Sequence, residues 1–105
     1  METNEYRFTL FEHVGKLYAE NDDGTTIELG TLRQDERGRF GFRLNGDTAK
    51  GYGFASVQAA LANLADKLSL SYMQDQFATA PSRRITTAMR RANRMEVRLD
   101  SASSR

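Results

Sequence analysis

The spacing of apolar residues changes near Ser56, and this change limits the chain to one order of strands and helices. Before that point, apolar and polar residues alternate in short runs such as residues 6–11, which is typical of strands with one buried face. After it, Val57, Leu61 and Leu64 begin an apolar stripe at helical spacing. A set of antiparallel strands followed by a helix is therefore expected.

Five short strands are predicted before this change. Turn-forming sequences such as NDDG and QDERG separate them, because Asp and Gly tolerate the left-handed backbone of tight turns. The predicted strands cover residues 6–11, 16–20, 25–33, 39–45 and 49–54. Short strands joined by short polar turns indicate an antiparallel meander.

One long helix is predicted over residues 57–76. Ser56 is a suitable N-cap because its hydroxyl can accept from the amides of the first turn, and QAALANLADKL is rich in strong helix formers. A second, shorter helix is predicted from Ser82 to about Met95. The following MEVRL alternates as a last short strand would, and DSASSR is expected to be a disordered tail.

The predicted fold is α+β: an antiparallel β-meander of four to five strands with one long helix packed on one face, plus a short basic C-terminal helix. Residues 1–80 are expected to form a single domain. Residues 81–105 are expected to belong to that domain or to be partly disordered. The expected core residues are Tyr6, Phe8, Leu10, Leu17, Ile27, Leu29, Phe40, Phe42, Leu44, Val57, Leu61, Leu64 and Leu68.

Residue composition excludes several kinds of active site. The chain has no cysteine, which rules out disulfide scaffolds, thiolate zinc sites and cysteine nucleophiles. Its one histidine, His13, lies in a predicted turn without further metal ligands at a suitable spacing. The motifs of serine hydrolases, nucleotide-binding loops and zinc proteases are absent from the sequence. We therefore expect no enzymatic activity, no catalytic residue, no metal and no cofactor.

The sequence favours a cytoplasmic location without a membrane partner. Its start, METNEYRF, lacks the apolar core of a signal peptide, and no apolar run reaches the length of a membrane helix. The absence of cysteine is consistent with a reducing compartment.

Electric charge is unevenly distributed along the chain. Residues 1–80 carry eight Lys and Arg against twelve Asp and Glu, whereas residues 81–105 carry seven Arg against two acidic residues. Arginine suits phosphate because its planar guanidinium can donate two parallel hydrogen bonds. Five arginines are candidates to bind nucleic acid or an acidic protein partner: Arg83, Arg84, Arg90, Arg91 and Arg94. The alternative is a solvated helix face whose apolar side covers the sheet.

The predicted hairpin over residues 39–54 combines four aromatic rings with glycines and three basic residues. With an even number of residues in the loop, as with Asn45-Gly46 or Gly46-Asp47 at its centre, Tyr52 and Phe54 would share a face with Arg39 and Arg43. That face could stack on unpaired bases. With a three-residue turn, all four rings would share one face and would form core, leaving the opposite face basic and rich in glycine. A bulge in the hairpin would also account for the glycines.

Several strands followed by a long helix over residues 6–76 resemble, in element order alone, the Whirly and PUR-type binders of single-stranded nucleic acid. The resemblance implies a dimer that binds on its curved sheet. Open edges at the first and last strands also favour a homodimer. The leading hypothesis is a small nucleic-acid-binding accessory protein for DNA or RNA. The alternatives are a protein-interaction module, such as a phage or plasmid inhibitor or adaptor, and a structural subunit of an assembly.

Overall fold

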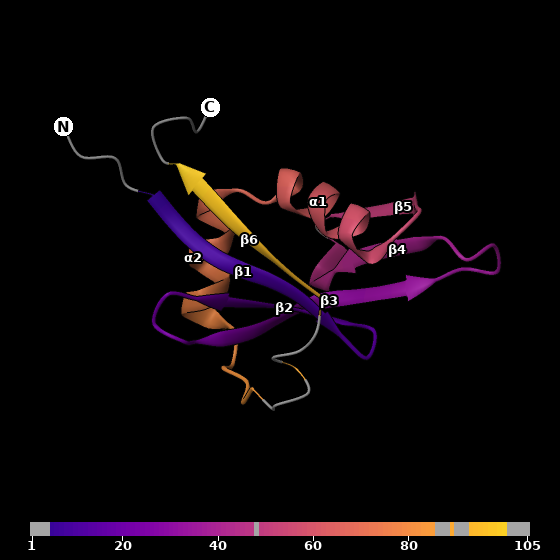
Figure 1. The fold of residues 1–105 in the computed structure, drawn as a ribbon. Coiled ribbons are helices and arrows are strands. Elements are labelled where there is room, and N and C mark those ends of the chain that lie inside the picture. Colours follow the sequence, from indigo (N-terminus) through magenta and orange to yellow (C-terminus); the bar gives the residue numbers. More distant parts are fainter. Residues whose placement is uncertain (1–4, 48, 86–88, 90–92, 101–105) are drawn as a thin grey trace.

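A computed structural model describes residues 5–47, 49–85, 89 and 93–100 of the chain. It contains one antiparallel sheet with the strand order β5-β4-β3-β2-β1-β6 (Figure 1). The first five strands form a meander, and the sixth returns to pair with β1. The strands are β1 (Glu5–His13), β2 (Lys16–Asn21), β3 (Thr26–Gln34), β4 (Phe40–Leu44), β5 (Lys50–Phe54) and β6 (Asn93–Asp100).

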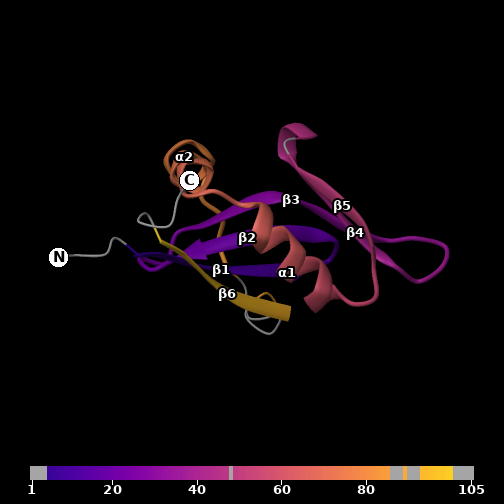
Figure 2. The same cartoon turned by 90° about the horizontal axis from the view of Figure 1, so that it is seen from above.

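Two short helices, α1 (Val57–Lys67) and α2 (Leu70–Thr79), pack on the inner face of the curved, half-barrel sheet (Figure 2). The α+β class and the antiparallel sheet are confirmed. The more detailed prediction, a sheet of four to five strands under one long helix, is wrong: the sheet has six strands and the helical region is divided in two.

The break between the two helices lies at Leu68 and Ser69. Leu68 ends α1 in extended backbone with φ −85° and ψ 134°. Ser69 is also extended, and its hydroxyl accepts from the backbone N–H of Tyr72 at 3.1 Å as the N-cap of α2. A serine side chain competes with helical hydrogen bonding in this way. The apolar stripe continues across the break, so periodicity alone predicted one helix.

The predicted C-terminal helix is wrong at both of its ends. Residues 82–85 are not helical and the strand β6 begins at Asn93, whereas Met89 between them is helical; residues 86–88 and 90–92 lie outside the described part. The predicted MEVRL strand is confirmed and extends to Asp100, the first residue of the expected tail. Residues 101–105 of that tail also lie outside the described part.

Pairing with β1 explains why this segment is a strand. Its register runs without interruption from Glu5 opposite Asp100 to Glu12 opposite Asn93. Val97 is buried in the core, and alternation brings Met95 and Leu99 to the same face. As a result β1 is an interior strand, and the edges of the sheet are β5 and β6.

The hydrophobic core lies between the inner face of the sheet and the two helices. Most of the predicted core residues are buried, and Tyr6, Phe40 and Val57 are partly buried against the same cluster. Phe11 was not expected in a core because alternation places it on the outer face. It is nevertheless fully buried there, with its ring stacked on Tyr18 at a centroid distance of 5.1 Å.

Next to the turn, the hairpin of β4 and β5 has the register predicted for an even-numbered loop centred on Gly46 and Asp47, and a bulge changes it farther along β5. Next to the turn, which contains the short 3₁₀ segment Asn45–Asp47, Arg43 pairs with Lys50 and Phe42 with Gly51. Farther along, Phe40 pairs with Phe54, so the register shifts by one residue in β5. Such a bulge changes the face to which the following side chains point.

The bulge separates two aromatic side chains that are only two positions apart. Gly53 has a φ of +82°, which glycine adopts without strain. Phe54 lies on the inner face with its ring stacked on Phe42 at 5.8 Å. Tyr52 lies on the outer face and is 64% exposed. The hairpin therefore supplies ring surface both to the core and to solvent.

Alanine substitutions at these two positions test the bulge. We expect Phe54→Ala to lower the free energy of unfolding by about 1.5–3 kcal/mol, because it removes partly buried ring surface. Tyr52→Ala is expected to change it by less than about 0.5 kcal/mol. Urea denaturation followed by circular dichroism measures both. A larger loss for Tyr52→Ala than for Phe54→Ala would contradict the register.

Candidate nucleic-acid interface

The exposed ring of Tyr52 lies over Gly41 on the neighbouring strand. A Cβ atom added to Gly41 would lie 2.8 Å from Cδ1 of Tyr52 and 3.0 Å from the carbonyl oxygen of Gly51. Both distances are shorter than ordinary van der Waals contact. Residue 41 must therefore be glycine for the ring to rest against the sheet as it does.

Basic side chains from three strands surround this ring on the outer face. The register places Thr31 opposite Arg43, Arg43 opposite Lys50, and Arg33 opposite Gly41, and paired residues share a face. The side chains of Arg33, Arg43 and Lys50 are all exposed. We call Arg33, Arg39, Arg43, Lys50 and Tyr52 the basic face.

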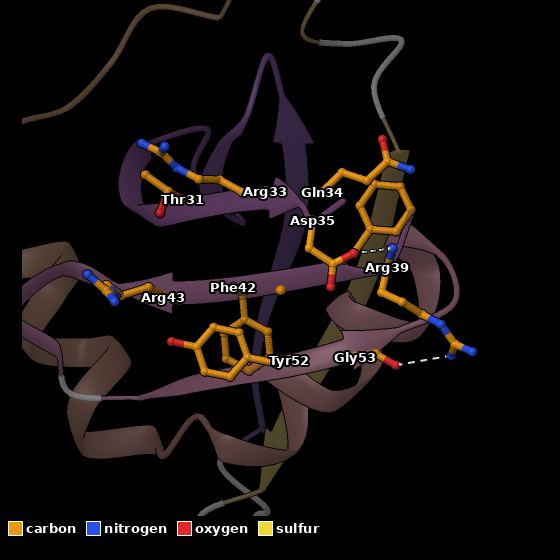
Figure 3. A pocket seen from close by; sticks show the side chains of 11 residues that line it. Thr31, Arg33, Gln34, Asp35, Arg39, Phe42, Arg43, Tyr52 and Gly53 are labelled. Carbon is orange, nitrogen blue, oxygen red and sulfur yellow. Dashed lines mark hydrogen bonds between the residues drawn. The ribbon is translucent and has the colours of Figure 1, made fainter. Parts of the chain in front are cut away.

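A shallow hollow of about 460 Å³ lies within the basic face. Figure 3 shows the Tyr52 ring between Arg43 on one side and Arg39 on the other. The guanidinium of Arg39 donates through Nη1 to the carbonyl oxygen of Gly53 at 3.5 Å. The lining residues are Thr31, Arg33, Gln34, Asp35, Arg39, Phe40, Gly41, Phe42, Arg43, Tyr52 and Gly53.

The turn between β3 and β4 fixes one rim of the hollow. Oδ1 of Asp35 accepts from the backbone N–H groups of Arg37 at 2.8 Å and Arg39 at 2.9 Å. The side-chain amide of Gln34 donates to the carbonyl oxygen of Gly38 at 3.1 Å. These bonds fix the backbone position of Arg39, from which its side chain extends to the carbonyl oxygen of Gly53.

Two of the predicted C-terminal arginines have structural partners. The backbone N–H of Arg83 donates to the carbonyl oxygen of Thr26 at 2.6 Å, and its guanidinium lies 3.1 Å from the carboxylate of Glu28. The guanidinium of Arg94 lies 2.7 Å from Glu20, and its Cζ atom lies 4.8 Å from the centre of the Phe11 ring. Both arginines therefore hold the returning chain against the outer face of β1–β3.

The same part of the outer face perturbs Tyr18. Burial raises the pKa of its phenol, the carboxylate of Glu28 raises it further, and Arg83 opposes both effects. The folded protein therefore resists ionisation of Tyr18 at high pH. This behaviour fits a packed side chain whose ring supports Phe11.

The predicted binding residues fall into three groups. The structure brings Arg39, Arg43 and Tyr52 together around the hollow. None of the residues that line it comes from the C-terminal segment, where Arg83, Arg84 and Arg94 are described. The predicted residues Arg90 and Arg91 lie outside the described part.

Sequence reasoning missed Arg33 as a site residue. Its register opposite Gly41 places it beside the Tyr52 ring. The signal was its position at the polar end of the third predicted strand, but only the pairing of β3 with β4 shows which side it faces.

Neither a metal centre nor a membrane span is found in the described residues. Among them, no three His, Asp or Glu side chains gather as metal ligands would. Neither α1 nor α2 has the length and apolar character that crossing a membrane requires.

Comparison with protein families, curated proteins and solved structures finds no match. The resemblance in element order to Whirly and PUR-type binders gains no support from that comparison.

Alanine substitutions separate the structural arginines from the exposed ones. Arg94→Ala removes an ion pair and a ring contact that are partly buried, so we expect the free energy of unfolding to fall by about 1–3 kcal/mol. Arg84 is exposed, and Arg84→Ala is expected to change it by less than about 0.5 kcal/mol. Chemical denaturation measures both variants. Equal effects would contradict a structural role for Arg94.

Proposed function

We propose that this protein is a non-enzymatic binder of single-stranded nucleic acid, and that the basic face is its binding surface. The observation that carries the proposal is the exposed Tyr52 ring, set against Gly41 and surrounded by arginines from neighbouring strands. A cytoplasmic location belongs to the same proposal, and the cysteine-free composition agrees with it.

The ring favours unpaired bases over a duplex. An aromatic side chain on a sheet stacks on a base only when the base is free of its own neighbours, as in single strands, loops and bulges. Stacking of this kind contributes about 1–3 kcal/mol per base and depends little on base identity. We therefore expect modest sequence specificity.

The surrounding cations suit the backbone of the same ligand. Arg33, Arg43 and Lys50 extend across three adjacent strands, and a strand of nucleic acid crossing them would bring successive phosphates past each one. Arginine can also stack on bases. Asp35 is the acidic residue among those that line the hollow, and its Oδ1 is already engaged by two backbone amides.

The C-terminal arginines have a different part in this proposal. Arg83 and Arg94 form ion pairs with Glu28 and Glu20, so their contribution is to hold the segment that leads into β6. Arg84 is an exposed cation and can add phosphate contacts outside the hollow. These arginines are tested by single substitutions, because removing the whole segment after Ala80 would also remove β6 and uncover β1.

Substitution of Tyr52 tests the stacking. Tyr52→Ala is expected to weaken binding of a labelled single-stranded DNA or RNA by about 5- to 150-fold, which corresponds to the loss of one stacked base. Tyr52→Phe keeps the ring and is the matched control, so its affinity should stay near that of the wild type. Fluorescence anisotropy measures the affinities, and thermal melting checks that each variant is folded.

Salt dependence tests the arginines in the same assay. Arg43→Ala and Arg33→Ala should each reduce the slope of log affinity against log salt by about 0.7, the value for one phosphate contact on a single strand. Tyr52→Ala should leave that slope unchanged. A wild type that binds no nucleic acid, or a Tyr52→Ala variant that binds as well as the wild type, would overturn the proposal and turn attention to an acidic protein partner.

A further inference from the structure

The two edges of the sheet are protected to different degrees. β5 carries a bulge, two glycines and Lys50 along its edge, and such features discourage another strand from pairing. β6 lacks the bulge and the glycines: its register with β1 is unbroken and it contains neither glycine nor proline. Its charged residues Glu96 and Arg98 are of opposite sign. Within the described part of the chain, no strand covers the outer side of β6.

The backbone of β6 shows which of its groups point outward. The side-chain amide of Gln58 donates to the carbonyl oxygen of Arg94 at 3.5 Å, so this carbonyl points away from β1. The N–H and C=O of one residue point to the same side of an antiparallel strand, and the side alternates along the chain. The backbone groups of Glu96 and Arg98 therefore also point outward.

The side chains of β6 are complementary to a second copy of the same strand. When two copies run antiparallel about an axis at Val97, Glu96 of one lies opposite Arg98 of the other, and Met95 lies opposite Leu99. Glu96 and Arg98 lie on the outer face and are 58% exposed, whereas Met95 and Leu99 lie on the core face. Opposite charges meet on one face, and apolar residues meet on the other.

Neighbouring registers are less favourable. Moving the axis to Met95 places Glu96 opposite Arg94, but the carbonyl oxygen of Arg94 already accepts from Gln58 and its guanidinium is paired with Glu20. Moving it to Glu96 places Glu96 opposite itself and Arg94 opposite Arg98, and moving it to Arg98 places Arg98 opposite itself. Like charges directly opposite each other destabilise a strand pair, and a one-residue slip would also exchange the faces. The axis at Val97 is therefore the favoured one.

We propose that β6 pairs with β6 of a second copy, and that the protein is a symmetric homodimer with one continuous sheet. Glu96 and the second copy's Arg98 exchange backbone hydrogen bonds on each side of the axis. Gln58 closes the edge at Arg94, so the pairing covers residues 95–99. The axis is perpendicular to the sheet, which brings the outer faces of both copies to the same side. The proposal does not depend on nucleic-acid binding.

Charge reversal tests the proposed register. Glu96→Arg and Arg98→Glu each place like charges opposite each other at both symmetric pairs, so each should weaken dimerisation by about tenfold or more. The double variant Glu96→Arg/Arg98→Glu restores opposite charges and should recover the wild-type affinity. An equimolar mixture of the two single variants should form a heterodimer. Sedimentation velocity over a range of concentrations measures each association.

A matched control and two outcomes make the test decisive. Glu36→Arg makes the same change in net charge as Glu96→Arg, in the exposed turn between β3 and β4, and it should leave dimerisation unchanged. Thermal melting checks that the exposed substitutions leave the fold intact. A wild type that stays monomeric up to about 1 mM would overturn the proposal. So would a dimer that neither single variant weakens, or a double variant that fails to recover.

Discussion

Burial of one face of the sheet under two short helices is the constraint on which the rest of this structure depends. Each strand residue points either to that core or to the outer face, and alternation decides which. The core residues Phe8, Leu10 and Phe42 therefore determine where their neighbours point. Arg43 and Arg33 lie on the outer face because the residues beside them, Phe42 and Leu32, fill the core.

Local patterns predicted the strands well and the helices less well. The alternation around Phe8 and the turn sequences were sufficient to locate five strands, since both signals lie within a few residues. The division at Ser69 was missed because the apolar stripe has the same spacing in one helix as in two. Only residues 95–99 of β6 were predicted as a strand. Its first residues, Asn93 and Arg94, were assigned to the basic helix, because their pairing with β1, about eighty residues earlier in the chain, leaves no local signal.

The candidate site was predictable in its residue types but not in its grouping. The hairpin sequence brought Arg39, Arg43 and Tyr52 into consideration, and the pairing of β4 with β5 then placed them together. Arg83 and Arg94 look the same as Arg84 in the sequence. Their difference comes from Glu28 and Glu20, which are distant along the chain and close in the fold. Contacts of this kind leave no local signal.

The bulge at Gly53 has a consequence for how the surface and the interior can change independently. Without the extra residue, Tyr52 and Phe54 would share a face, and any change of one ring would be felt by the other. With the extra residue, the Phe54 ring packs on Phe42 in the core. The side chain at position 52 contacts solvent and any ligand that binds the outer face. A substitution at position 52 can therefore alter the outer surface while the packing of the core stays the same.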